Sequence, residues 1–258
     1  MGASIRIGIC APPERVSEIA PGYDYLELGV SSALAPLQSD KEYALREHQL
    51  ATLTPHVRAF NGFVPAQVKL VGEGVNWGQV TTYVERAVRR AAALGGQTIV
   101  FGSGGARSVP EGYPRALAWG QLVRFLNECA DQAAVHGVTI AIEPLNHSET
   151  NIINTYPEAV QLARDVGRKE IRVLADIYHF MMDAEPLDDI AEAPEWLTHV
   201  HLADTGRHFP GSGAYPIERL FAILKDIDYV GGASIECRWG EDFHGETARA
   251  LAFLRTLA

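Results

Sequence analysis

Short apolar runs alternate with amphipathic stretches along most of the chain. Near-continuous apolar runs are typical of parallel strands that helices cover on their outer face. We expect eight strands, at residues 5–10, 23–28, 57–60, 98–101, 138–143, 171–176, 199–203 and 233–236. We expect helices between or after these strands, at residues 40–54, 77–94, 114–136, 156–166, 187–193, 216–227 and 242–257.

This alternation predicts an α/β protein that forms a single (β/α)8 TIM barrel. Repeated strand-then-helix units in a chain of 258 residues are typical of that closed parallel architecture. The competing arrangement is a doubly wound open sheet, which usually has fewer strands and a glycine-rich loop after the first strand. No such loop follows residues 5–10, and no linker or repeat divides the chain, so we expect one domain over residues 1–258.

The composition is that of an ordinary soluble globular protein, with 47% hydrophobic and 21% charged residues. A net charge of −10 argues against a nucleic-acid partner, because binding to phosphate backbones normally requires a basic surface. The three cysteines form no disulfide framework, which suits a reducing cytosol. The N-terminus has no signal-peptide pattern, and no apolar run approaches the ~20 residues of a membrane span. We therefore expect a cytoplasmic protein without a membrane partner.

Four of the later apolar runs end on a residue that can bind a metal. VTIAIE ends at Glu143, IRVLAD at Asp176, THVH at His201 and GASIE at Glu236. One carboxylate after a strand can be a solvated loop residue or a helix cap. Three carboxylates and a histidine on successive strands predict a divalent-cation site, because these strand ends meet at one rim of a barrel. His199 faces the same way as His201 but lies deeper, and we expect it to be a buried, hydrogen-bonded residue of the interior.

The expected donor set is rich in oxygen and contains one imidazole. Such a set suits Mn²⁺, Mg²⁺ or Co²⁺ better than a structural Zn²⁺ site. Four protein ligands leave room on a six-coordinate ion for two neighbouring oxygens of a hydroxyketone. The adjacent C–H then becomes acidic enough for a carboxylate to remove its proton. We expect one divalent ion, in the first place Mn²⁺, with Mg²⁺, Co²⁺ and Zn²⁺ as alternatives.

Several motifs resemble those of a known family. EPLNHSETN, LADIYHF, HVHLADTGRHFPGSG and SIE resemble the ketose 3-epimerases of the D-tagatose/D-psicose 3-epimerase type, in the xylose-isomerase-like TIM-barrel superfamily. The motifs follow one another in the family's order over the C-terminal half. The resemblance implies that Glu143, Asp176, His201 and Glu236 are metal ligands, and that Glu143 and Glu236 are also the catalytic acid/base pair. It also implies a homo-oligomer, either a dimer or a tetramer.

The resemblance extends to residues that hold the substrate. It implies substrate-binding roles for Glu149, His179 and Arg207, which could hold the O1 to O3 region of a sugar and stabilise an enediolate. The alternatives are a packed side chain for His179 and a surface ion pair for Arg207. The chain departs from the family at His147, where the epimerases carry an arginine.

The implied reaction is C3 epimerisation of a ketose or ketose phosphate. One glutamate removes the C3 proton, a metal-bound enediolate forms, and the other glutamate returns a proton from the opposite side. Hydroxypyruvate isomerase and inosose dehydratase share the barrel and the ligand pattern. An apurinic-site endonuclease needs more histidine ligands and a basic surface, and a non-catalytic sugar-binding barrel has no need of two acid/base glutamates.

The glycine-rich loop FGSGGAR, which ends at Arg107, has two interpretations. Its backbone N–H groups could cradle a phosphate, with Arg107 adding positive charge. Alternatively, it is a tight turn that lets the backbone approach the pocket.

Overall fold

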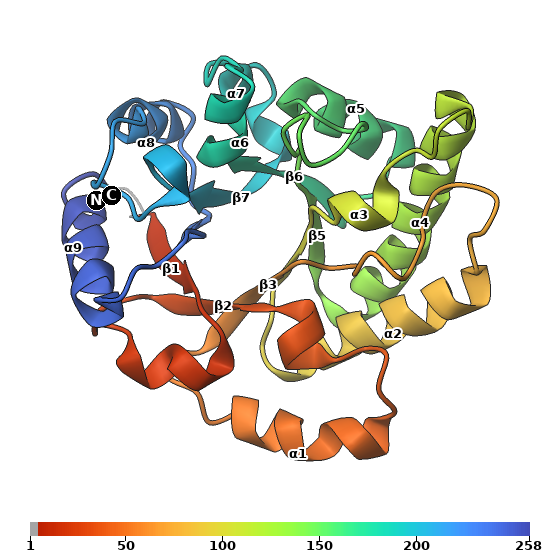
Figure 1. Ribbon diagram of the computed structural model, residues 1–258, viewed down its shortest axis with the longest axis horizontal. Coiled ribbons are helices and arrows are strands. Elements are labelled where there is room, and N and C mark those ends of the chain that lie inside the picture. The colour runs from red at the N-terminus through yellow and green to blue at the C-terminus, as the bar shows by residue number, and fades with distance from the viewer. Residues whose placement is uncertain (1–4) are drawn as a thin grey trace.

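The computed structural model describes residues 5–258. Its parallel strands close into a barrel in sequence order, with the first strand paired to the last. The strands form an inner ring and the longer helices an outer ring (Figure 1). The expected (β/α)8 barrel is confirmed, and the open sheet is excluded by the closure. Residues 1–4, where the segment without a signal-peptide pattern begins, lie outside the described residues.

Each expected strand overlaps an observed strand. The strands are β1 (Arg6–Cys10), β2 (Tyr25–Gly29), β3 (Val57–Asn61), β4 (Thr98–Phe101), β5 (Thr139–Ile142), β6 (Ile171–Asp176), β7 (Leu197–Leu202) and β8 (Gly232–Ile235). The α-helices are α1 (Asp40–Leu50), α2 (Trp77–Ala93), α3 (Gly104–Arg107), α4 (Arg115–His136), α5 (Tyr156–Val166), α6 (Ile177–Met182), α7 (Asp189–Glu192), α8 (Ile217–Asp226) and α9 (Phe243–Arg255). None of the helices within residues 5–258 has both the length and the apolar character needed to cross a bilayer.

The connections near the N-terminus contain short helical elements that the sequence pattern does not predict. A 3₁₀ helix, η1 (Pro13–Glu18), follows β1, and a single π-helical turn, η2 (Val30–Leu34), lies between β2 and α1. After β6, helix α6 begins at once, whereas the sequence pattern predicts a helix only at residues 187–193. Helices of one or two turns carry too little hydrophobic periodicity to be recognised in a sequence.

Apolar packing is divided between two layers. The large core lies between the strands and the helices, and it contains Leu26, Phe60 and Ile99. A second, separate cluster consists of Val100, Ala141 and Leu174, each 0% exposed. Because side chains alternate along a strand, these three residues face the barrel interior on β4, β5 and β6. The interior therefore has apolar packing on one side.

The other side of the interior is filled by Tyr25. A Cβ atom placed on Gly8 would lie 2.2 Å from the Tyr25 ring, and one placed on Gly232 would lie 2.5 Å from its hydroxyl oxygen. Glycine at these two positions leaves the space that the aromatic ring occupies. Tyr25 accepts a hydrogen bond from the Ser234 hydroxyl at 2.9 Å. This side of the interior thus contains polar groups and hydrogen bonds.

Glu185 is a buried carboxyl group outside the barrel interior. Its Oε1 accepts the backbone N–H of Tyr156, at the start of α5, at 2.7 Å. Burial, together with the negative charges of Asp189 and Asp183, raises the pKa of Glu185 to about 7, although the Tyr156 hydrogen bond opposes this shift. The folded chain therefore retains a proton on Glu185 over a pH range in which the unfolded chain has released it.

Replacing Glu185 by glutamine should make the protein less sensitive to rising pH. The ordinary pKa of glutamate is about 4.3, so folding stability should fall as pH rises from there through the folded-state value, by at most about 2–3 kcal/mol. Glutamine keeps an acceptor for the Tyr156 N–H and has no charge to bury. Urea unfolding at pH 5 and pH 8 should show that Glu185→Gln gains stability relative to the wild type at the higher pH. An equal difference at both pH values would contradict the raised pKa.

Candidate metal centre and active site

Four strand ends bring their polar side chains together inside one rim of the barrel. Glu143 directly follows β5, Asp176 ends β6, His201 lies in β7 and Glu236 directly follows β8. One donor atom from each residue lies within 4.8 Å of the others. The strand register explains this, because Asp176 lies level with His201, and His201 lies level with Ser234, two residues before Glu236. The structure thus brings together the four residues that the sequence predicts as ligands.

The carboxylate of Asp176 indicates that these residues fit a divalent cation. Its Oδ1 accepts the backbone N–H of Tyr178 at 2.8 Å and so caps α6. Its Oδ2 is fully buried and has no hydrogen-bond partner among residues 5–258. A buried carboxylate oxygen without a donor is unfavourable unless a cation balances it. Three carboxylates and one imidazole are also the donor types that hard or borderline divalent ions accept.

His201 is fully buried, and both of its ring nitrogens face carboxylates. Nδ1 lies 3.2 Å from Glu143 Oε1 and 3.6 Å from Glu236 Oε2, whereas Nε2 lies 2.8 Å from Glu27 Oε1. Burial lowers the pKa of His201, but the negative charges of Glu27 and Glu236 outweigh it and raise the pKa well above its ordinary value. The imidazole therefore balances negative charge at the centre of the cluster.

The two glutamates of the cluster have opposite electrostatic environments. For Glu143, burial raises the pKa, but the hydrogen bond and charge of His201 outweigh burial, and the pKa is lowered. For Glu236, burial is the largest effect and, with the negative charges of Glu143 and Asp176, it raises the pKa. A pair of carboxyl groups whose pKa values are shifted apart can divide the roles of proton acceptor and proton donor.

Arg207 lies over the cluster on a strained loop. Its Nη2 donates to Glu236 Oε2 at 2.6 Å, and its Nη1 lies 3.6 Å from Glu149 Oε1. The guanidinium carbon lies 4.5 Å from the centre of the Tyr178 ring. Arg207 has a φ of 62°, a left-handed conformation that a residue with a side chain rarely adopts. The surrounding contacts therefore hold this arginine in one place.

His179 presents one free nitrogen toward the cluster. Its Nδ1 accepts the backbone N–H of Asn146 at 3.2 Å and lies 2.8 Å from the Asn146 side-chain amide. Its buried Nε2 has no hydrogen-bond partner within the described chain and lies 3.6 Å from Asp176 Oδ2. Since Nδ1 accepts, the ring proton belongs on Nε2. Asn146 also donates to Glu149 Oε1 at 3.1 Å, so one amide connects these two predicted substrate-binding residues.

Two residues of the cluster's surroundings were not predicted. Glu27 of β2 is fully buried and bonds to His201, as described above. Asn61, the last residue of β3, donates to Glu236 Oε1 at 3.0 Å and to Cys10 Sγ at 3.4 Å. Asn61 directly follows an apolar run, so the reasoning applied to the later strand ends could have found it. Glu27 lies within its strand and carries no such positional signal.

The glycine-rich loop supports Glu143. Arg107 is fully buried and donates to the backbone oxygens of Phe101, Glu143 and Ile153 at 3.0, 2.9 and 3.1 Å. Burial lowers the pKa of Arg107 to about 10, so the group stays charged at neutral pH. With its charge directed at these carbonyl groups, Arg107 is not available to a phosphate in the loop. The backbone approach expected in the second interpretation is present, because a Cβ atom at Gly102 would lie 2.2 Å from Glu143 Oε2.

The chain is similar to sugar epimerases over part or most of its length. The D-psicose 3-epimerase of Agrobacterium fabrum is 33% identical over 115 residues, which are 44% of this chain and only 40% of that protein. The 3-dehydro-D-guloside 4-epimerase of Escherichia coli K12 is 30% identical over 184 residues, which are 67% of this chain and 69% of that protein.

Solved structures share the fold over nearly the whole chain. The crystal structure of D-psicose 3-epimerase with D-tagatose from Clostridium cellulolyticum H10 has a TM-score of 0.85, covers 98% of this chain and 99% of its own, and is 21% identical. At that identity the likeness concerns the fold alone. The model of one family, described as the xylose isomerase-like TIM barrel, matches residues 14–257. A match of that extent shows that this chain belongs to the xylose isomerase-like TIM barrel family.

Proposed function

We propose that this protein is a divalent-metal-dependent sugar epimerase that acts at C3 of a ketose or ketose phosphate. The observation that carries the proposal is the convergence of Glu143, Asp176, His201 and Glu236 within 4.8 Å at the strand ends. Two members of that cluster are glutamates with oppositely shifted pKa values. The similarity to a D-psicose 3-epimerase and to a 3-dehydro-D-guloside 4-epimerase supports the same reaction class.

The four clustered residues hold one divalent ion in this proposal. Mn²⁺ is the first candidate, and Mg²⁺, Co²⁺ and Zn²⁺ are alternatives. When bound, such an ion polarises a carbonyl group and makes the neighbouring C–H more acidic. The unpartnered Asp176 Oδ2 is the donor that gains most, because it is buried and lacks a hydrogen bond from residues 5–258.

The two glutamates transfer the proton. Glu143, whose pKa is lowered, is suited to stay ionised and accept the C3 proton on one face of the sugar. Glu236, whose carboxylate accepts a hydrogen bond from Arg207, returns a proton on the other face. Removal on one face and return on the other inverts the configuration at C3. In the reverse direction the two residues exchange roles.

Three further side chains orient the sugar. His179 offers its Nε2–H toward the cluster, and Arg207 offers a guanidinium group directly beside Glu236. Glu149 lies 3.6 Å from Arg207 and accepts the Asn146 amide. A donor, a cation and an acceptor in one place can hold neighbouring hydroxyl and carbonyl oxygens of an open-chain ketose.

Incubation with Mn²⁺ in D₂O tests the reaction directly. A panel of free and phosphorylated ketoses should give one or more C3 epimers, with deuterium at C3 of the product because the returned proton exchanges with solvent. NMR spectroscopy identifies product and label position together. Conversion of a ketose to an aldose, or loss of water from a cyclic polyol, would instead indicate an isomerase or a dehydratase on the same barrel.

Substitution of either glutamate should stop the proton transfer. Glu143→Gln and Glu236→Gln should each lower the rate of C3 epimerisation by at least about a hundredfold at saturating Mn²⁺, the usual contribution of an acid/base group. Glu195→Gln, at an exposed position, serves as the matched control with wild-type activity expected. Wild-type rates of C3 proton exchange in both site variants would rule out the two-glutamate mechanism.

Gly102 should be required for the position of Glu143. A Cβ atom at Gly102 would lie 2.2 Å from Glu143 Oε2, so alanine would displace the flexible end of that side chain and leave the backbone in place. We expect Gly102→Ala to fold normally and to lose about tenfold or more in Mn²⁺ affinity, as typically follows when a ligand is mispositioned. Gly120→Ala on α4, where a Cβ atom meets nothing, is the control and should bind Mn²⁺ normally. Equal affinity of the two variants would contradict this role.

A further inference from the structure

Glu27 is a carboxylate that is fully buried in the barrel interior and shared by two histidines of β7. Its Oε1 lies 2.8 Å from His201 Nε2, and its Oε2 lies 2.8 Å from His199 Nε2. Glu27 and His201 are 0% exposed, and His199 is 3% exposed. A buried charged group requires hydrogen-bond partners, and these two histidines provide them. The expectation that His199 is a buried, hydrogen-bonded residue of the interior is confirmed.

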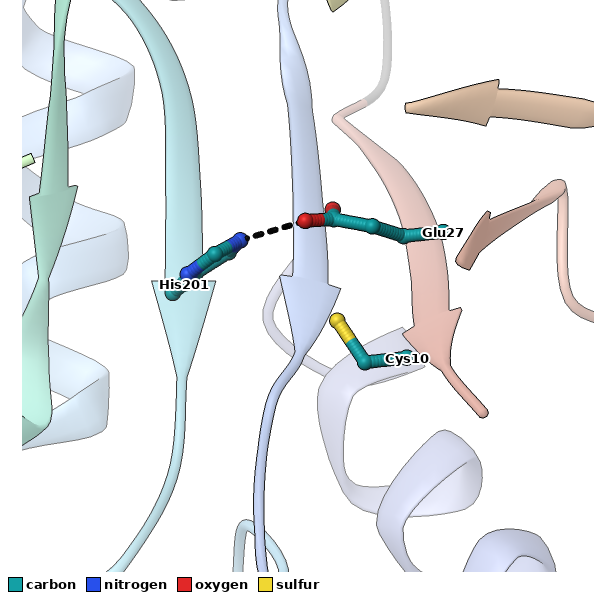
Figure 2. Close-up of side chains that lie close together, drawn as sticks. All are labelled: Cys10, Glu27 and His201. Atoms are coloured by element: carbon teal, nitrogen blue, oxygen red, sulfur yellow. Dashed lines mark hydrogen bonds and ion pairs between the residues drawn. The ribbon is translucent and has the colours of Figure 1, made fainter. Parts of the chain in front are cut away.

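This arrangement determines which nitrogen of His201 keeps its proton when a cation binds to the cluster. An ionised carboxylate only accepts hydrogen bonds, so the nitrogen that faces Glu27 must be the donor, Nε2–H. Nδ1 faces Glu143, a member of the cation cluster, at 3.2 Å, so a bound cation replaces the proton on Nδ1 and leaves the one on Nε2. Figure 2 shows Glu27 and His201 pointing toward one another from β2 and β7, with the Cys10 thiol beside them.

Further contacts deeper in the barrel interior support the orientation of Glu27. His199 Nε2 lies 3.3 Å from the Ser234 hydroxyl, which in turn donates to the Tyr25 hydroxyl at 2.9 Å. Tyr25 fits only because Gly8 leaves space for its ring. These contacts come from four neighbouring strands, so Glu27 has little freedom to turn away from His201.

We propose that Glu27 is a positioning residue that holds His201 in the tautomer and ring orientation that present Nδ1 to the divalent cation. The inference rests on the proposed metal centre and extends it by one residue. Glu27 does not touch the cation or the substrate and acts through His201. A carboxylate that receives the second ring N–H of a metal-bound histidine commonly has this effect on affinity.

A second cation bound by Cys10, Glu27 and His201 is the competing arrangement. Their donor atoms also lie within 4.8 Å of one another. Such a cation would need His201 Nε2, which is engaged with Glu27 at 2.8 Å, and the Cys10 sulfur already accepts a hydrogen bond from Asn61. The two arrangements differ in the number of ions bound per chain.

The test is Glu27→Gln, measured by calorimetric titration with Mn²⁺. Glutamine keeps the length and shape of Glu27, but its amide nitrogen can donate to His201 Nε2 and so drive the ring proton to Nδ1. We expect a folded variant with one binding event per chain and a loss of Mn²⁺ affinity between about tenfold and a hundredfold. Unchanged affinity in the folded variant would overturn the proposal.

Two control variants address the alternatives. Glu170→Gln alters another buried glutamate, which lies directly before β6 and pairs with Arg168 at 3.6 Å, and it should leave Mn²⁺ affinity unchanged. If Glu170→Gln lost as much Mn²⁺ affinity as Glu27→Gln, the loss would reflect a general effect of changing a buried carboxylate and would contradict the proposal. Cys10→Ala should keep both the affinity and the single binding event. Two Mn²⁺ ions per wild-type chain, with one lost in Cys10→Ala, would favour the competing cation.

The position of the proton on the His201 ring is a measurement that would not change if Glu27 had only a structural role. In wild-type protein loaded with Zn²⁺, ¹⁵N NMR of the ring should show His201 protonated at Nε2; a proton at Nδ1 would overturn the proposal even if Glu27→Gln failed to fold. Failure of the proposed function can be distinguished from failure of this proposal. If the wild type binds one Mn²⁺ but epimerises no ketose, and Glu27→Gln loses affinity as expected, the reaction is refuted and the positioning role is supported. A wild-type protein that binds no Mn²⁺ would refute both.

Discussion

The site depends on the register of a closed parallel barrel. Because all strands run the same way, their carboxyl ends meet at one rim, and pairing between neighbours determines which side chains are level. Asp176 pairs with His201, and His201 with Ser234, so the residues that bear donor groups meet inside the barrel. A slip of one residue in β7 would turn His201 outward and remove the centre of the cluster. Closure of β1 on β8 completes the ring and allows Glu27 of β2 to reach β7 from the opposite side.

The same register concentrates negative charge in a small, dry volume. Glu27, Glu143 and Asp176 are each 6% exposed or less, and the basic side chains that face them within residues 5–258 include His199, His201 and Arg207. Burial alone would raise the pKa of Glu27, but the charges of His201 and His199 lower it far below its ordinary value. His199 and His201 thus balance the negative charge of Glu27. Above it, the buried Asp176 Oδ2 still lacks a donor from the described residues, which is the electrostatic reason to expect a cation there.

The sequence predicted the barrel and the strand-end residues because both follow from local patterns. Apolar runs mark strands, and a polar residue at the end of a run marks the rim, which was enough for Asp176 and His201. Contacts over long distances in the chain leave no such mark: Glu27 is separated from its two histidines by 172 and 174 residues. A charged residue within an apolar strand indicates that a buried partner exists, but not which one. His147 illustrates the reverse case, since it lies next to the predicted residues in sequence but is 67% exposed and pairs with Asp183.

The sequence left two interpretations of the glycine-rich loop open for a related reason. A loop of glycines followed by an arginine has the composition of an anion site, and only the fold reveals that Arg107 turns inward to three backbone carbonyl oxygens. The short helices α3 and α6, which carry or follow residues of the site, escaped prediction because they are too brief to show periodicity. Local pattern therefore located the strand ends, whereas the supports behind them required three-dimensional structure.

The separation of the two apolar layers has a consequence for how this protein can change. Among residues 5–258, the apolar cluster inside the barrel is small, with Val100, Ala141 and Leu174, and the extensive packing lies outside the strands. Substitutions in the outer layer therefore change mainly the stability of the fold. Substitutions in the interior, which contains Tyr25, His199 and Glu27, change mainly the chemistry of the site. Robustness and catalytic specialisation can thus evolve in largely separate parts of one small barrel.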